Sequence, residues 1–213
     1  RLGANGATAL LLDCGLPFDK IQKGLRFGVA QLAGCLLTHA HGDHSKSARD
    51  LMRFGVDVYA TTPTFEALGL AGQRRAKVVE PYKPLAFAGW QITPISCKHD
   101  ADGTVGYLIQ RGEFVALYLT DTAYTVNTFE GLTHLFVECS HSAETMRENT
   151  RSGGLTTGRF DRVRNNHMSI ETLECMLRAN DLSRLQEVWL LHLSDQNSDE
   201  AEFKRRVQAI TGT

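Results

Sequence analysis

The segment Thr38-His39-Ala40-His41-Gly42-Asp43-His44 decides the fold class and guides the rest of the interpretation. It contains three imidazoles and one carboxylate within six residues, directly after an apolar run. Imidazoles are common ligands of zinc and iron, and a carboxylate extends the choice to manganese. The first two histidines alternate as side chains on one face of an extended segment do, and we expect the glycine after them to supply a tight bend. The segment therefore predicts that one loop faces a metal centre.

Length and composition are those of an ordinary globular domain. The chain has 213 residues, of which 42% are hydrophobic and 22% charged, and its formal net charge is -1. These values predict a single domain over 1–213 that is large enough to bury a core. The near-neutral charge excludes a general attraction to polyanions, so such a partner must meet a local basic patch or a bound metal ion.

Two further features of the sequence concern the compartment. No apolar stretch approaches the ~20 residues that a membrane helix needs, so no membrane partner is expected. The five cysteines lack a paired spacing and are flanked by apolar residues, which indicates reduced thiols in a core. Both observations predict a cytoplasmic protein.

Six short apolar runs each lead to a residue that can bind a metal ion or move a proton. Runs of this length and composition favour buried strands over helices. The ends of such strands meet at one edge of a sheet, so the donors that follow them are expected to form one pocket. The donors are Asp13, His39, His99, Asp121, Glu138 with His141, and His192.

Helical periodicity is clear in three places and absent from a fourth. We predict a helix over Ser45 to Phe54, and another over Ser169 to Ala179 that is capped by Ser169. A last helix is predicted from near Ser198, with acidic residues in its first turn. The stretch from Arg147 to Asn166 has no period and contains several glycines, so a long loop or arm is predicted there. Strands and helices together indicate an α/β fold.

These motifs run nearly from end to end, and by them the chain resembles the metallo-β-lactamase-fold hydrolases. The resemblance implies an αββα sandwich of two mixed sheets flanked by helices, with two divalent ions at one edge. It implies that Asp13 supports the site without binding metal, and that strands preceding Leu11-Leu12-Asp13 are missing or truncated. The implied ligands are His39, His41 and His99 for a first ion, Asp43, His44 and His192 for a second, and Asp121 as the bridge between them.

Three later segments are similar to those of the YycJ/WalJ-like branch, whose activity is 5′-to-3′ exonuclease action on DNA. Ser140 stands where that branch has asparagine and Ser142 where it has an acid, which leaves the contacts around His141 open. The segments are Glu138-Cys139-Ser140-His141, Asn166-His167-Met168-Ser169 and His192-Leu193-Ser194-Asp195-Gln196-Asn197.

The resemblance implies a dinuclear metal-dependent hydrolase of phosphodiesters, with zinc or manganese as the metal and iron as a further choice. Two ions roughly 3.5–4 Å apart can share a hydroxide, which would attack phosphorus. The same ligands would also serve a small-molecule or cyclic phosphodiesterase, as in PhnP-like relatives, or a thioester or lactone hydrolase. A metal-bearing scaffold without turnover is a further alternative, although the intact ligand set argues against it.

Four residues are predicted to act on the substrate. Asp43 and His167 are the candidate catalytic residues, and His167 lies just before a helix, where it could stabilise a charged transition state or protonate a leaving oxygen. His141, His167 and Arg164 are candidate substrate-binding residues.

Basic residues predominate in the stretch that contains Arg164. Arginine forks suit phosphate oxygens, so the stretch predicts contact with a DNA backbone, although a solvated loop explains it equally well. Its arginines are Arg147, Arg151, Arg159, Arg162 and Arg164, against Glu148 and Asp161, and Phe160 is its lone aromatic residue.

Overall fold

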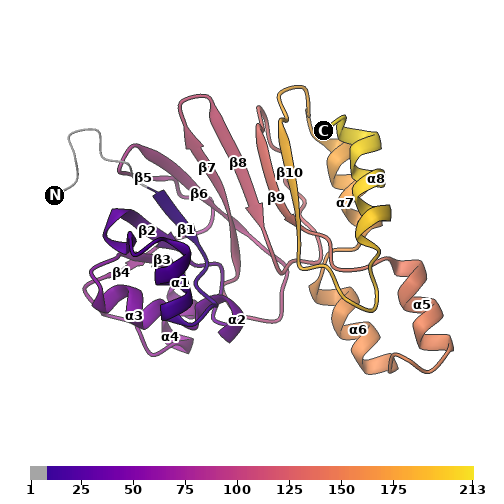
Figure 1. Cartoon of the computed structure of the whole chain (residues 1–213), viewed down its shortest axis with the longest axis horizontal. Helices are drawn as coiled ribbons and strands as arrows, with labels where there is room; N and C mark the ends of the chain where they lie inside the picture. Colours follow the sequence, from indigo (N-terminus) through magenta and orange to yellow (C-terminus); the bar gives the residue numbers. More distant parts are fainter. Residues whose placement is uncertain (1–8) are drawn as a thin grey trace. The chain divides into compact units, whose positions relative to one another are not determined.

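The computed structural model of the chain describes residues 9–213, and the prediction about missing opening strands lies outside these residues. Hydrogen bonding orders the strands into a four-stranded sheet, β1-β2-β3-β4, and a six-stranded sheet, β10-β9-β8-β7-β6-β5. The chain folds as two compact units (Figure 1). The first ends at Ser96 and also includes Ala101–Tyr107, and the second consists of Cys97–Asp100 and Leu108–Thr213.

The first unit is built on the four-stranded sheet, whose neighbouring strands all run parallel. An antiparallel pair, β5 with β6, belongs to the same unit. Its strands are β1 Ala9–Leu12, β2 Leu32–Leu36, β3 Val58–Ala60, β4 Ala76–Val78, β5 Leu85–Phe87 and β6 Trp90–Ser96. Its helices are α1 Phe18–Gly24, α2 Gly42–Ser45, α3 Ala48–Arg53 and α4 Thr62–Ala67, with a 3-10 turn at Val29–Gln31.

The core of the first unit forms where these helices cover the sheet. Leu51 of α3 and Phe65 of α4 are buried against β2 and β3. The side chain of Tyr107 is fully buried, and its hydroxyl donates to the carbonyls of Leu37 and Tyr59, 2.8 and 3.1 Å away. This tyrosine ties the chain that leaves β2 to its neighbour β3.

The second unit is built on three parallel strands, β8 Phe114–Leu119, β9 His134–Glu138 and β10 Glu187–Leu191. Strand β7 Val105–Arg111 begins in the first unit and ends in the second. The helices of the second unit are α5 Ala143–Arg151, α6 Thr157–Asn166, α7 Ile170–Ala179 and α8 Glu200–Thr211. Helices α7 and α8 pack against each other (Figure 1).

The structure confirms the α/β fold with two sheets flanked by helices, and all six apolar runs lie in or next to strands. The helix capped by Ser169 is also confirmed, since the Ser169 hydroxyl accepts from the N–H of Thr172. The helix predicted over Ser45 to Phe54 is shorter and lies at Ala48–Arg53. The last helix begins at Glu200, after an Asp199 cap.

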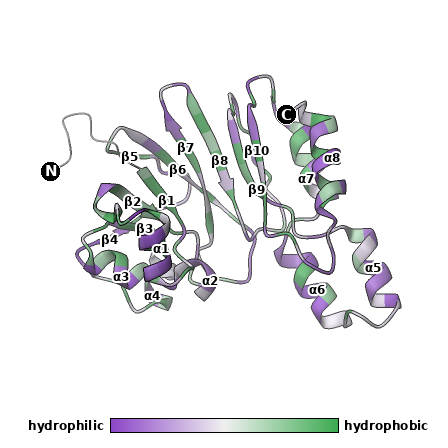
Figure 2. Ribbon diagram, in the orientation of Figure 1, coloured by the Kyte–Doolittle hydropathy of each residue, from purple (hydrophilic) through white to green (hydrophobic). Residues whose placement is uncertain are grey.

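The prediction of a loop or arm from Arg147 to Asn166 is wrong. Helices α5 and α6 occupy most of this stretch, and each has a hydroxyl cap at its start, Ser142 and Thr156. Most residues of the two helices are hydrophilic (Figure 2), and α6 buries no side chain. A helix without a wide apolar face produces no hydrophobic periodicity in the sequence. The capping residues Ser142 and Thr156 were therefore not recognised as helix starts.

Two structural observations concern the residues on which the predicted compartment rests, the apolar helices and the cysteines. No helix within residues 9–213 is long and apolar enough to cross a membrane. All five cysteines are free thiols, and Cys14, Cys35 and Cys139 are buried as predicted. Cys175 is exposed, so the prediction of a core thiol is wrong there.

Candidate metal centre

The loop after β2 supplies the donors of the first unit. His39 is fully buried in this loop, and His41 precedes the short helix α2, which carries Asp43 and His44. The turn of α2 makes the reversal, because the N–H groups of His44 and Ser45 both donate to the carbonyl of His41. Gly42 has ordinary helical backbone and open space around it, so the expectation that it supplies a special bend is wrong.

Asp13 orients this loop from the end of β1. Its carboxylate accepts from the N–H of Thr38 at 2.8 Å and lies 2.8 Å from Nδ1 of His44. The Thr38 hydroxyl donates to the same carboxylate at 3.0 Å, and also lies 3.0 Å from Nδ1 of His39. Both Asp13 and His44 are buried, so the contacts form in a region of low dielectric where they are strong. These contacts fit the supporting role that was predicted for Asp13.

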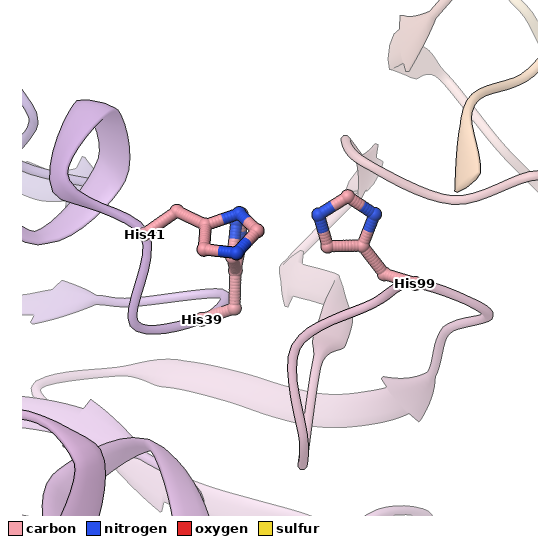
Figure 3. Close-up of side chains that lie close together, drawn as sticks. All are labelled: His39, His41 and His99. Carbon is pink, nitrogen blue, oxygen red and sulfur yellow. The ribbon is translucent and has the colours of Figure 1, made fainter. Parts of the chain in front are cut away.

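The histidine rings of the loop lie close together. The ring centroid of His39 lies 4.7 Å from that of His41 and 4.4 Å from that of His44. Nε2 of His44 lies 3.9 Å from a carboxylate oxygen of Asp43, whose side chain is exposed. Figure 3 draws His39 and His41 from this loop together with His99, which comes from the segment after β6 and belongs to the second unit.

The second unit gathers three donors at the ends of its parallel strands and a fourth, His167, at the end of α6. Asp121, Glu138, His167 and His192 each present a ligand atom within 4.8 Å of the other three. Nδ1 of His192 lies 3.0 Å from Oδ1 of Asp121, and Nδ1 of His167 lies 3.4 Å from the same oxygen. Nδ1 of His167 also lies 2.5 Å from Oε1 of Glu138. The group brings together the predicted ligands Asp121 and His192 with the predicted catalytic His167.

Three residues of the candidate site adopt an unusual backbone conformation. Asp13, Asp121 and His192 have φ angles of +56°, +47° and +56°. Residues other than glycine rarely adopt positive φ, and such strain, of order 1–3 kcal/mol each, tends to occur at functional sites. All three follow the ends of strands, β1, β8 and β10, where the left-handed turn redirects the chain.

Glu138 was read in the sequence only as a donor at a strand end, and was not assigned to the site. Its side chain is fully buried, and one carboxylate oxygen accepts from the N–H of Thr122 at 2.9 Å. The other oxygen contacts His167. A buried glutamate that ends an apolar strand was the signal, because such a group is seldom buried without a charged partner or a metal ion.

His99 lies apart from that group, in a setting of its own within the second unit. Nδ1 of His99 lies 3.2 Å from the carbonyl oxygen of Asn166, and Nε2 lies 3.2 Å from a carboxylate oxygen of Asp100. Burial lowers the pKa of His99, although the Asn166 carbonyl and the carboxylates of Asp121 and Asp100 oppose this. A neutral imidazole is the form that binds metal ions.

His167 and His141 have pKa values that are shifted in opposite directions. Burial alone would lower its pKa, but hydrogen bonds to Asp121 and Glu138 outweigh burial and raise the pKa to about 10. His141 has the opposite setting, because burial lowers its pKa to about 4. Its carbonyl accepts from the N–H of Ile170, which fixes His141 against the start of α7. Arg164, the other predicted substrate-binding residue, is exposed on α6.

The donor chemistry fits divalent metal ions. Histidine ligands commonly give the ring nitrogen that faces away from the metal to a carboxylate or a carbonyl. The Nδ1 atoms of His44 and His99 make contacts of this kind, with the carboxylate of Asp13 and with the carbonyl oxygen of Asn166. Imidazoles and carboxylates together suit zinc, manganese or iron.

Comparisons with known proteins agree with this geometry. A family model described as a beta-lactamase superfamily domain matches residues 8–193. Exodeoxyribonuclease WalJ of Streptococcus pneumoniae is 28% identical over 206 residues, which are 89% of this chain and 75% of that protein. Exodeoxyribonuclease YycJ of Bacillus anthracis is 25% identical over 150 residues, which are 65% of this chain and 57% of that protein.

Among solved structures, the metallo-beta-lactamase fold protein YhfI from Bacillus subtilis matches with a TM-score of 0.70 at 18% identity. The match covers 97% of this chain and 83% of that protein, and it shows the fold. Proteins of this superfamily are typically hydrolases that bind divalent metal ions. The family match, the donor groups and the fold agree with one another: the chain belongs to the metallo-β-lactamase branch of the beta-lactamase superfamily.

Proposed function

We propose that this protein is a dinuclear metal-dependent phosphodiesterase that degrades DNA from an end, in the 5′-to-3′ direction. The observation that carries the proposal is the group formed by Asp121, Glu138, His167 and His192, in which side chains that suit a metal ion lie beside an imidazole that two carboxylates contact. The names of two relatives, both exodeoxyribonucleases, support DNA as the substrate.

The proposed metal ligands are those that the family resemblance implies. Zinc or manganese, or alternatively iron, would supply a water of lowered pKa and positive charge for the phosphate oxygens. Asp13 would hold His44 in the orientation that coordination needs, and the buried carboxylate of Glu138 would orient His167 and His192. The proposed ligands are His39, His41, Asp43, His44, His99, Asp121 and His192.

His167 is the proposed catalytic residue that moves a proton. The carboxylates of Asp121 and Glu138 contact Nδ1 of His167, and in the metal-free protein these contacts raise its pKa. A protonated imidazole can neutralise charge on a phosphate oxygen or give its proton to the leaving oxygen. Asp43, which is exposed at the start of α2, is the proposed essential ligand on the substrate side.

The remaining parts of the proposal concern the partner and the compartment. DNA would meet exposed arginines of α5 and α6, among them Arg164, as its backbone is drawn to a basic patch. The free thiols fit a reducing cytoplasm.

The test is cleavage of end-labelled duplex and single-stranded DNA by protein loaded with manganese or zinc, with Asp43→Ala as the control. Mononucleotides released from one end by the wild type, and absent with Asp43→Ala, would support the proposal and give the polarity. If DNA stays intact while bis(p-nitrophenyl) phosphate is hydrolysed, the enzyme is a small-diester phosphodiesterase instead. Inertness toward both would leave thioesters and lactones as the substrates to try.

A further inference from the structure

The second unit contains a large hollow beside the group formed by Asp121, Glu138, His167 and His192. Its volume is about 840 Å³, within the range of roughly 300–1,000 Å³ that is typical of small-molecule sites. Helices α5, α6 and the start of α7 contribute to its wall, together with the loop after β8 and the segment before His99. Its chemically distinctive lining residues are Lys98, Tyr124, His141, Arg147, Phe160 and Arg164.

The charge of the lining has one sign. Lys98, Arg147 and Arg164 line the hollow, and no carboxylate does within the part of the chain that the structure describes. None of these three cations forms an ion pair with an acidic side chain among residues 9–213. Cations that converge on one space repel one another unless an anion joins them, and the guanidinium fork of arginine fits a phosphate group.

Planar side chains lie beside this charge. Tyr124 is 49% exposed, and Phe160 is half-buried on α6. Aromatic rings with such partly open faces stack with nucleobases, and the stacking energy is largely independent of the sequence. The lining therefore offers partners for both parts of a nucleotide, cations for its phosphate and aromatic rings for its base.

His141 contributes a buried ring nitrogen to this lining. Only 2% of its surface is exposed, and Nδ1 has no hydrogen-bond partner within residues 9–213. A buried nitrogen without a partner is costly, so a ligand that bonds to it would recover that energy. His141 lines the hollow, where such a ligand would lie.

The hollow borders the donor group of the second unit through one residue. His167 lines the hollow, and its Nδ1 also contacts Asp121 and Glu138. A ligand in the hollow would therefore lie next to the proposed proton donor.

We propose that this hollow is a nucleotide site, which takes the terminal nucleotide of a strand and holds the mononucleotide that cleavage releases. Arg147, Arg164 and Lys98 bind the phosphate, while Tyr124 stacks on the base and His141 bonds to one of its polar edges. The inference rests on the proposed nuclease function for its role in the reaction, but the binding itself can be measured without turnover.

The experiment is calorimetric titration of the metal-loaded protein with deoxyadenosine 5′-monophosphate, deoxyadenosine and inorganic phosphate. The whole nucleotide is expected to bind at least tenfold more tightly than either part, because each part reaches only one kind of lining residue. Arg147→Ala should weaken nucleotide binding about tenfold and leave nucleoside binding unchanged. Tyr124→Ala should weaken nucleotide and nucleoside binding alike, and Tyr124→Phe should retain both.

Arg151→Ala is the matched control, since Arg151 lies one turn further along α5 and does not line the hollow. Equal losses for Arg147→Ala and Arg151→Ala would overturn the proposal in favour of a diffuse surface charge. Nucleotide binding no tighter than phosphate binding would overturn it in favour of a plain anion site. Tight nucleotide binding without DNA cleavage would refute the nuclease function and support the nucleotide site. DNA cleavage without nucleotide binding would support the nuclease function and refute the nucleotide site.

Discussion

The carboxylate of Asp13 lies 2.8 Å from Nδ1 of His44, and both side chains are buried. The same carboxylate accepts from the backbone N–H of Thr38, so a single group at the end of β1 holds both ends of the histidine loop. The loop is thereby preorganised before any metal ion is bound, which reduces the ordering that binding must impose.

Replacing Asp13 with alanine is expected to lower metal affinity 10–100-fold, as losing a carboxylate behind a histidine ligand commonly does. It should also reduce the free energy of unfolding by about 1–3 kcal/mol, because Thr38 and His44 lose a buried partner. Metal content after dialysis against a buffered zinc series measures the first effect, and urea unfolding with EDTA measures the second. Asp19→Ala, on the exposed face of α1, is the control that should change neither. Unchanged zinc affinity in Asp13→Ala would show that the carboxylate only stabilises the fold.

Gly15 is expected to tolerate no side chain. A Cβ atom there would lie 1.5 Å from the carbonyl oxygen of Asp43, so the backbone of the metal loop would have to move. Gly15→Ala should therefore destabilise the protein by more than about 2 kcal/mol and lower metal content. In Gly24→Ala, at the end of α1, the added methyl meets nothing within 4 Å, and stability should rise by roughly 0.5–1 kcal/mol. Urea unfolding of both variants gives the comparison, and a silent Gly15→Ala would contradict the close approach.

The sequence was sufficient to predict the strands that position the site, because short apolar runs ending in donors mark buried strands. Asp121 and His192 could be placed at strand ends in this way. The positive φ angles of these residues could not be predicted, because left-handed backbone in a residue other than glycine leaves no mark in composition. Strands β3 and β4 have three residues each, too few to show a period.

The helices α5 and α6 were missed for a related physical reason. Their stability does not come from a wide apolar face, since α5 buries only Met146 and α6 buries none of its residues. Hydrophobic periodicity arises when one face of a helix is buried, so it does not indicate a helix that stays mostly in solvent. Arg147, Phe160 and Arg164 were named as candidate DNA contacts, but the hollow that they line could not be predicted, because they converge only after these helices have formed.

Asp43 is expected to be needed for metal binding and dispensable for folding. Its side chain is 73% exposed, and one of its carboxylate oxygens lies 3.9 Å from Nε2 of His44. Asp43→Ala should therefore change the free energy of unfolding of metal-free protein by less than about 0.5 kcal/mol. Bound metal per chain should fall, and hydrolysis of bis(p-nitrophenyl) phosphate should drop at least about 100-fold, since the loss of a ligand removes charge stabilisation from the reaction. Plasma emission spectrometry and steady-state kinetics measure these quantities, and a full metal complement in the variant would exclude Asp43 as a ligand.

His167 separates proton transfer from metal binding. If it acts as the proton donor, His167→Ala should lower phosphodiester hydrolysis by about 10²–10⁴-fold and leave metal content unchanged. Because Nδ1 of His167 lies 3.4 Å from Asp121 and contacts Glu138, the alternative is that it coordinates an ion itself. The two cases differ in one measurement, because loss of metal from His167→Ala would show that it is a ligand. His134→Ala, at the start of β9 and outside the donor group, is the matched control.

His141 should give the stability of the protein a pH dependence of known sign. Burial lowers its pKa in the folded state from an ordinary value of 6.5 to about 4. As the pH falls below 6.5, His141 becomes protonated in the unfolded chain but stays neutral in the folded protein until about pH 4. The unfolded state therefore gains stability relative to the folded state over this range. The contribution is complete above pH 6.5 and is lost toward pH 4, and its full size is about 3 kcal/mol.

His141→Phe keeps a ring in the same space but cannot titrate, so its stability should fall less steeply over this window. Urea unfolding at half-unit pH steps with EDTA compares the two proteins, in which every other titrating group is the same. Parallel curves would mean that the pKa of His141 is the same in the folded and unfolded protein, which would contradict the shift caused by burial.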